Sequence, residues 1–239
     1  MKLDGVNRAA APVELNFFEI VGSKTGELLP TGQAINVIEG IEVSCVDVAV
    51  PMMIARASDF GIIGTESRLE LDQMPELFSK IESFRLKAGK LMGLGDVTKS
   101  VVPKVGLISK PQSGGHFEAR YFMPWSTHPS MAVTGSLCLA SSALVSGTIF
   151  NGITKAVENS PETVRIEHPI GYIDVLISFT RDINRLNLNK AGVARTARLI
   201  AQGEVLQLQH QGEVDMLEET YLKIISAKTA ELFLSLIHI

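Results

Sequence analysis

The stretch "STHPSMAVTGSLCLASSALVSG", residues 126–147, contains no Asp, Glu, Lys or Arg, yet its first half is rich in hydroxyl side chains. Its second half is mostly Leu, Ala, Val and Ser, which favours a buried helix that begins near Val133 or Thr134. The first backbone N–H groups of a helix have no partner inside the helix and carry partial positive charge. A helix start of this kind binds carboxylates without any basic side chain.

A membrane-spanning helix is the alternative interpretation of this stretch. Residues 131–150 are uncharged over about the length that spans a bilayer. Only eight of these residues are strongly apolar, and no cluster of Lys or Arg flanks either end to set an orientation. The composition therefore favours a buried helix in a soluble domain.

Side chains around the predicted helix start indicate an anion-binding site. The hydroxyls of Ser130, Thr134 and Ser136 lie close in sequence to the unpaired amides. Arg120 precedes His128 by eight residues on a predicted strand, and its guanidinium can hold the same anion with two hydrogen bonds. This set suits a small polycarboxylate, and preset donors also stabilise the charge that develops in an enolate.

A structural role for the same residues is the alternative. Ser and Thr are ordinary caps at a helix start, and Arg120 can simply pair with a surface acid. His128 precedes Pro129 and can cap a turn, whereas Cys138 inside an apolar helix is usually a small core residue.

Bulk composition confines any anion binding to a local site. The chain has 239 residues and a net charge of −4, which gives no overall attraction to nucleic acid or to an anionic membrane. Cys45 and Cys138 lie far apart without metal-ligand spacing, so we expect a reducing, cytoplasmic compartment. The sequence contains no phosphate loop, no dinucleotide fingerprint and no paired zinc histidines, so we expect neither a cofactor nor a metal.

The remaining pattern predicts strands and helices in an α+β (mixed α/β) order. A helix is predicted from an N-cap at Asp72 to about Leu91, where apolar residues recur at helical spacing. In residues 117–123, "FEARYFM", Phe, Ala, Tyr and Met alternate with Glu, Arg and Phe. Further strands are predicted at residues 13–20, 41–56 (two strands that meet near Pro51), 103–109, 163–168 and 172–179.

The segment "RYFMPWSTHPSMAVTGSLCLASSALVSGT", residues 120–148, resembles the PrpF family, which includes methylaconitate cis-trans isomerase and 4-oxalomesaconate tautomerase. "VTGSLCLA" resembles the tautomerase branch in particular. The resemblance covers about residues 5–205, and its other segments follow in the family's order: "LLPTG" at 28–32, "DVAVPMMIARASDFGIIGTES" at 47–67, "FRLKAGKLMGL" at 84–94, "PKVGLIS" at 103–109, "HPIG" at 168–171 and "VARTARLIAQGEV" at 193–205.

The resemblance implies a fold like half of diaminopimelate epimerase, in which a sheet wraps around a central helix, here followed by a C-terminal helix. The family's active site lies between two such halves, with both helix starts facing the substrate. Ile170 stands where the family has a hydroxyl, which weakens any contact from that turn. The implied substrate-binding residues are Arg120, His128, Ser130, Met131, Thr134, Gly135, Ser136 and His168.

The family's catalytic base is expected in a first half that this sequence lacks, so the catalytic residues are unknown and are not placed on Cys45 or Cys138. Residues 1–40 then correspond to the incomplete end of the first domain and residues 41–192 to the second. Residues 193–205 form a return segment.

Residues 206–239 look like a foreign helical tail. Residues 200–233 resemble a segment of polyprenyl diphosphate synthases, and the terminal "LSLIHI" matches a sequencing adaptor, so a chimera joined near Glu204 is one hypothesis. A genuine C-terminal helix is the alternative, because apolar residues of the tail recur at helical spacing. No Asp-rich "DDxxD" motif is present for a prenyltransferase reaction.

The leading functional hypothesis is a cofactor-independent isomerase or tautomerase of unsaturated tricarboxylates, of the 4-oxalomesaconate or 2-methylaconitate type. It would act by proton abstraction and return. The isolated chain is then expected to be inactive, because it supplies only the second half of the cleft. A non-catalytic polycarboxylate-binding fragment is the alternative, and a membrane or prenyl-lipid role ranks third. The expected partner is a small polycarboxylate, with no nucleic acid and no membrane, and a homodimer is one option for assembly.

Overall fold

The computed structural model describes residues 11–154, 159–182 and 185–197. Contacts divide the chain into two units, Glu14–Ala194 and the combination of Met1–Val13 with Arg195–Ile239. The predicted foreign tail at 206–239, with the expected C-terminal helix, lies outside the described residues, as does most of the return segment. The unit Glu14–Ala194 carries the candidate site.

Ten strands form one mixed sheet in the described part of the chain, in the order β1-β10-β9-β8-β6-β5-β4-β3-β2, with β7 paired to β6. The pairs β4–β5 and β6–β8 are parallel, and the other pairs with a described register are antiparallel. The strands are β1 (Ala11–Phe17), β2 (Asn36–Ile38), β3 (Ile41–Val48), β4 (Val50–Arg56), β5 (Lys104–Ser109), β6 (Phe117–Met123), β7 (Ser126–Thr127), β8 (Glu162–His168), β9 (Gly171–Asp182) and β10 (Arg185–Ala197).

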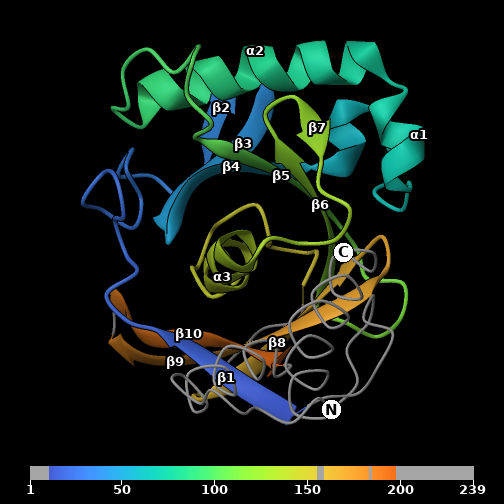
Figure 1. Cartoon of the computed structure of the whole chain (residues 1–239). Coiled ribbons are helices and arrows are strands. Elements are labelled where there is room, and N and C mark those ends of the chain that lie inside the picture. Colours follow the sequence, from blue (N-terminus) through green and yellow to red (C-terminus); the bar gives the residue numbers. More distant parts are fainter. Residues whose placement is uncertain (1–10, 155–158, 183–184, 198–239) are drawn as a thin grey trace, which may run out of the picture. The chain divides into compact units, whose positions relative to one another are not determined.

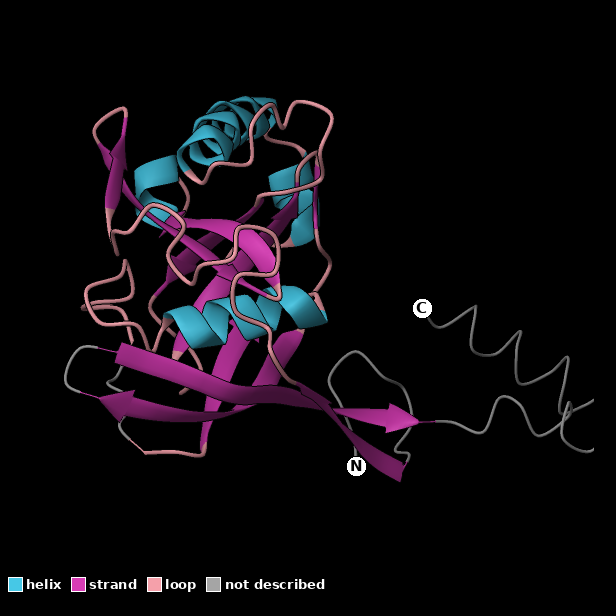
Figure 2. Ribbon diagram, turned by 90° about the vertical axis from the view of Figure 1, so that its left-hand side faces the viewer, coloured by secondary structure: helices cyan, strands magenta, loops and turns pink. Residues whose placement is uncertain are grey.

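Each parallel pair is joined by a crossover that contains a helix, because parallel neighbours cannot be connected by a tight turn. Helix α2 (Pro75–Leu91) lies between β4 and β5 in sequence, and α3 (Val133–Ser142) lies between β6 and β8. Figure 1 shows α2 on the outer side of β3–β5, whereas α3 lies between β3–β6 and β8–β10. The two helices therefore cover opposite faces of the sheet, which curves around α3 (Figure 2).

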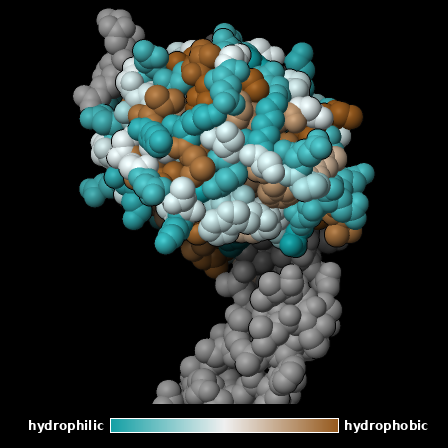
Figure 3. Space-filling model, turned by 90° about the horizontal axis from the view of Figure 1, so that it is seen from above, coloured by the Kyte–Doolittle hydropathy of each residue, from teal (hydrophilic) through white to brown (hydrophobic). Residues whose placement is uncertain are grey.

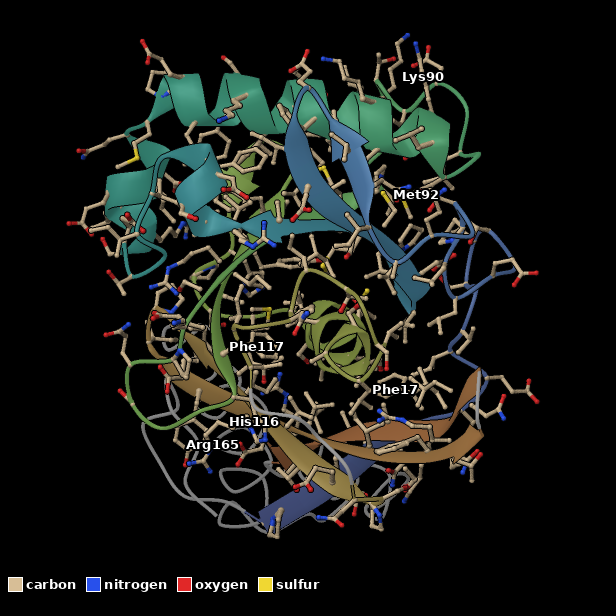
Figure 4. All side chains as sticks on the ribbon, turned by 180° about the vertical axis from the view of Figure 1, so that it is seen from behind. Phe17, Lys90, Met92, His116, Phe117 and Arg165 are labelled. Atoms are coloured by element: carbon tan, nitrogen blue, oxygen red, sulfur yellow. The ribbon has the colours of Figure 1, made fainter. Side chains whose placement is uncertain are left out.

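Alternation along the strands separates two hydrophobic cores. In β6, Phe117, Ala119 and Tyr121 join the inner core around α3, whereas Phe122 joins the outer core beneath α2. Phe117 packs edge-on against Phe150 with ring centroids 4.8 Å apart, and Figure 4 shows it on the α3 side of the sheet. The face on which a β6 side chain lies thus decides which helix it can reach.

The α+β fold expected from the sequence is confirmed, but the predicted start of the long helix is wrong. Asp72 is the last residue of a short helix, α1 (Arg68–Asp72), which follows a 3-10 turn at Ala57–Phe60. Helix α2 begins at Pro75, where proline's missing N–H costs nothing. Met74 precedes this proline in a non-helical conformation, as the proline ring requires.

The charge-free stretch forms a short helix: α3 has 10 residues, and turns follow it. Among the described residues, no helix combines the length and the apolar character needed to cross a membrane. Figure 3 views the molecule from the α2 side, where hydrophilic and hydrophobic residues are intermixed on the surface.

Candidate functional site

Helix α3 begins without a side-chain cap. Its N-cap residue is Ala132, which has extended backbone angles and no hydroxyl to offer the first turn. Thr134 is exposed at this start, whereas the hydroxyl of Ser136 donates to the carbonyl of Val133 (2.8 Å). Among the residues that the structure describes, no side chain therefore satisfies the first N–H groups of α3, which are the groups that attract an anion.

His128 lies in the turn that leads into α3, and its neutral form is favoured. Its backbone N–H donates to the carbonyl of Tyr121 (2.8 Å), and its Nδ1 accepts a hydrogen bond from the Ser130 amide (3.0 Å). Burial lowers the pKa of the imidazole, and the nearby charge of Arg68 lowers it further. A neutral ring that accepts at Nδ1 carries its proton on Nε2, which is then a hydrogen-bond donor.

Tyr121 connects the His128 turn to the helix start, a role that the sequence did not indicate. Its ring lies edge-on to His128, with centroids 5.9 Å apart. A Cβ at Gly135 would lie 2.4 Å from Cε2 of Tyr121, so only glycine allows this approach. Of Tyr121, 2% is exposed, and its Oη has no hydrogen-bond partner in the described part of the chain. Burial raises the pKa of this phenol, so it stays protonated and able to donate.

Two other predicted site residues are Met131, which lies in the core around α3, and His168, which lies at the end of β8. Met131 is 3% exposed and packs in the core around the helix, which makes it a packing residue in this structure. His168 ends β8 on the same strand face as Val164 and Ile166, which pack in the α3 core, and its Nδ1 accepts from the Ile170 amide (3.4 Å). Ile170 itself is 51% exposed.

Arg120 does not reach the start of α3, so the expected shared grip on one anion is corrected by the geometry. Neighbouring residues of a strand point to opposite faces, and Arg120 lies opposite Tyr121. Its Nε donates to the carbonyl of Glu66 (2.6 Å), its Nη1 to Ala119 (3.1 Å) and its Nη2 to Oε1 of Glu118 (2.8 Å). The guanidinium is almost fully buried on the outer face, where it acts as a structural cation.

The outer face carries further charges that are held within the fold. Both oxygens of the Glu167 carboxylate accept from backbone amides, at Gln112, Ser113 and Gly115 (2.6–2.8 Å). Although burial raises the pKa of Glu167, these amides lower it more, so the carboxylate stays ionised. Figure 4 shows His116 next to Arg165, whose amide donates to the His116 ring (3.0 Å).

Neither cysteine of the described chain is an activated thiol. Burial raises the pKa of Cys45 and of Cys138 to about 12, so both stay protonated at neutral pH. Cys138 lies inside α3 with its Sγ directed at the carbonyl of Val46 (3.9 Å). A thiolate base is therefore not supplied by either residue.

A cavity of about 890 Å³ lies at the opposite end of α3, beside Leu144 and Val145. Leu28, Leu188 and Arg181 are among the residues that line it. The guanidinium of Arg181 already donates to the carbonyl of Leu144 (2.8 Å). Glu27 also lines this cavity, whereas the first turn of α3 contains no acidic residue, so the helix start is the better candidate for anion binding.

Fold and sequence together define the class of this protein. The PrpF protein family matches residues 1–207, and the chain belongs to that family. YbhH of Escherichia coli (strain K12) is 43% identical over 205 residues, which make up 85% of this chain and 57% of YbhH. The (4E)-oxalomesaconate Delta-isomerase of Novosphingobium sp. (strain KA1) is 36% identical over 203 residues, 85% of this chain and 56% of that enzyme.

Solved structures agree with this assignment. The crystal structure of methylitaconate-delta-isomerase is similar with a TM-score of 0.73 and 29% sequence identity, over 83% of this chain and 56% of that chain. The present chain thus spans little more than half the length of the relatives that it matches.

Proposed function

We propose that this chain forms one half of the cleft of an isomerase that moves a proton within an unsaturated tricarboxylate. The names of its relatives support the reaction class, since they are isomerases of oxalomesaconate and of methylitaconate. In this proposal, the unit Glu14–Ala194 contains the second diaminopimelate-epimerase-like half, and the family's first half supplies the other wall. We also propose that residues 1–40 are the end of the family's first domain, that residues 41–192 are its second domain, and that residues 193–205 are a return segment.

The observation that carries the proposal is the uncapped start of α3 beside a neutral imidazole. Its first amides are held in place before a ligand arrives, so binding a carboxylate there requires no reorganisation. His128 and Thr134 provide donors at the edge of this start, and Ser130 provides its hydroxyl. Because Gly135 has no side chain, the Tyr121 ring can pack against the first turn of α3.

The roles follow from the chemistry of the residues. The helix amides and His128 hold a carboxylate, and they stabilise the negative charge that spreads onto it when a proton leaves the neighbouring carbon. Cys45 and Cys138 stay protonated, so in this proposal the group that removes the proton comes from the family's first half. His168, at the end of β8, lies on the strand face that packs against the core around α3.

Joining this chain to the N-terminal part of YbhH tests the isomerase directly. We expect proton exchange and double-bond migration in 4-oxalomesaconate or 2-methylaconitate, followed by NMR in deuterated buffer. The chain alone should give no turnover above the buffer rate. Binding of the tricarboxylate without turnover by the joined protein would favour the alternative, a non-catalytic polycarboxylate-binding protein.

A further inference from the structure

Arg68 supplies a positive charge next to the His128 turn, where the sequence led us to expect Arg120. Arg68 is the first residue of α1, and Ser67 before it forms a capping box with Glu70. The Arg68 side chain is 48% exposed. Its position is therefore fixed by a capped helix, while much of its guanidinium remains accessible.

Two hydrogen bonds attach this arginine to the strand that leads into His128. Nε of Arg68 donates to Oδ2 of Asp72 (3.1 Å), and Oδ1 of Asp72 accepts from the backbone N–H of Thr127 (3.0 Å). Thr127 is the residue before His128 in the chain. The same carboxylate thus orients the guanidinium and joins α1 to β7.

The remaining edge of the guanidinium has no partner in the described part of the chain. Only Nε of Arg68 forms a hydrogen bond there, which leaves Nη1 and Nη2 available. Two parallel N–H groups of arginine match the two oxygens of a carboxylate. The charge of Arg68 is also close enough to act on the His128 ring.

We propose that Arg68 is a second carboxylate-binding residue of the site, one that grips a different carboxylate of the ligand from the one at the start of α3. The inference rests on the proposed function, because it assigns the two anchors to one polycarboxylate. In the chain, His128 follows Thr127, which is attached to α1 through Asp72, and precedes the start of α3. A ligand with at least two carboxylates then satisfies both, whereas a monocarboxylate satisfies one.

The experiment follows the His128 ring by NMR in the full chain, with trans-aconitate as the probe. In the parent, a bound anion should raise the pKa of His128, because negative charge favours the imidazolium. Arg68→Gln should raise the His128 pKa before any ligand is added and should weaken trans-aconitate binding about tenfold or more, the loss expected for charge-assisted hydrogen bonds. Thermal melting verifies that the variant is folded.

Two further variants separate the effect of the Arg68 charge from the effect of its paired hydrogen-bond donors. Arg68→Lys keeps the charge but loses the paired donors, so the pKa of free His128 should stay low while binding still weakens. Arg56→Gln is the matched control, since Arg56 pairs with Glu42 and Asp59 away from β7, and it should change neither quantity.

Two results would overturn the assignment. One is equal trans-aconitate affinity in the parent and Arg68→Gln, and the other is a His128 pKa that the probe leaves unchanged in the parent. Both are independent of turnover, so they are distinct from a failure of the joined protein to catalyse isomerisation.

Discussion

Gly135 is the residue on which the geometry of the α3 start most depends. It is buried in the first turn of the helix, and the Tyr121 ring occupies the space that any side chain would need. The same ring touches His128. The absence of a side chain at Gly135 therefore allows the Tyr121 ring to contact both the first turn of α3 and His128.

Gly135→Ala should lower the free energy of unfolding, despite alanine's better helix propensity. The added Cβ, 2.4 Å from Cε2 of Tyr121, forces the ring or the helix to move, and overpacking of this kind costs about 1–3 kcal/mol. Thr134→Ala is the control, because Thr134 is exposed and a surface change of this kind stays within about 0.5 kcal/mol. Urea unfolding of both variants provides the measurement, and a Gly135→Ala protein as stable as the parent would mean that the ring yields freely.

Helix α1 is attached to the sheet from two sides. On the outer face, Arg120 of β6 donates to the carbonyl of Glu66, just before α1 begins. At the other end of the helix, Asp72 accepts from Thr127 of β7. Arg120 thus helps to hold in place the helix that carries Arg68.

Arg120→Met should destabilise the chain by about 3–5 kcal/mol at neutral pH, because it leaves Glu118 buried without its counter-charge. Burial raises the pKa of Glu118 above its ordinary value, while Arg120 opposes that shift, so removal of Arg120 raises the pKa further. A raised carboxyl pKa contributes stability at low pH that is lost as pH rises through the folded-state pKa. The deficit of Arg120→Met relative to the parent should therefore shrink as the pH is lowered.

Thermal melting of this variant across a pH series measures the effect. The double variant Glu118→Gln/Arg120→Met, which has no unpaired carboxylate, should recover part of the stability and lose the pH dependence of the deficit. A deficit that is equal at all pH values would show that Glu118 is not the group responsible.

Much of the fold was predictable from sequence, and part of the site was too. Residues 126–147 predict a buried helix with a charge-free start, because composition alone separates it from the charged helix before it. The alternation in residues 117–123 also predicts that Arg120 and Tyr121 lie on opposite faces, but it does not say which face α3 covers, so the prediction of Arg120 at the helix start was corrected only by the structure.

Long-range contacts were not predictable in this way. Asp72 and Thr127 are 55 residues apart in sequence, and no local pattern pairs them. The spacing of Arg68 and Asp72 predicts only a helical ion pair, which is common on surfaces. Their place beside His128 depends on how α1 packs on β7, and hence on the whole sheet.

The central claim is that the start of α3 binds a carboxylate, and amide NMR of the ¹⁵N-labelled chain with trans-aconitate tests it most directly. We expect saturable shifts that are largest at Val133, Thr134 and Gly135, whose N–H groups would donate to the ligand. Shifts that cluster instead at Leu144 and Val145, beside the cavity at the other end of α3, or no saturable shift at all, would contradict the claim.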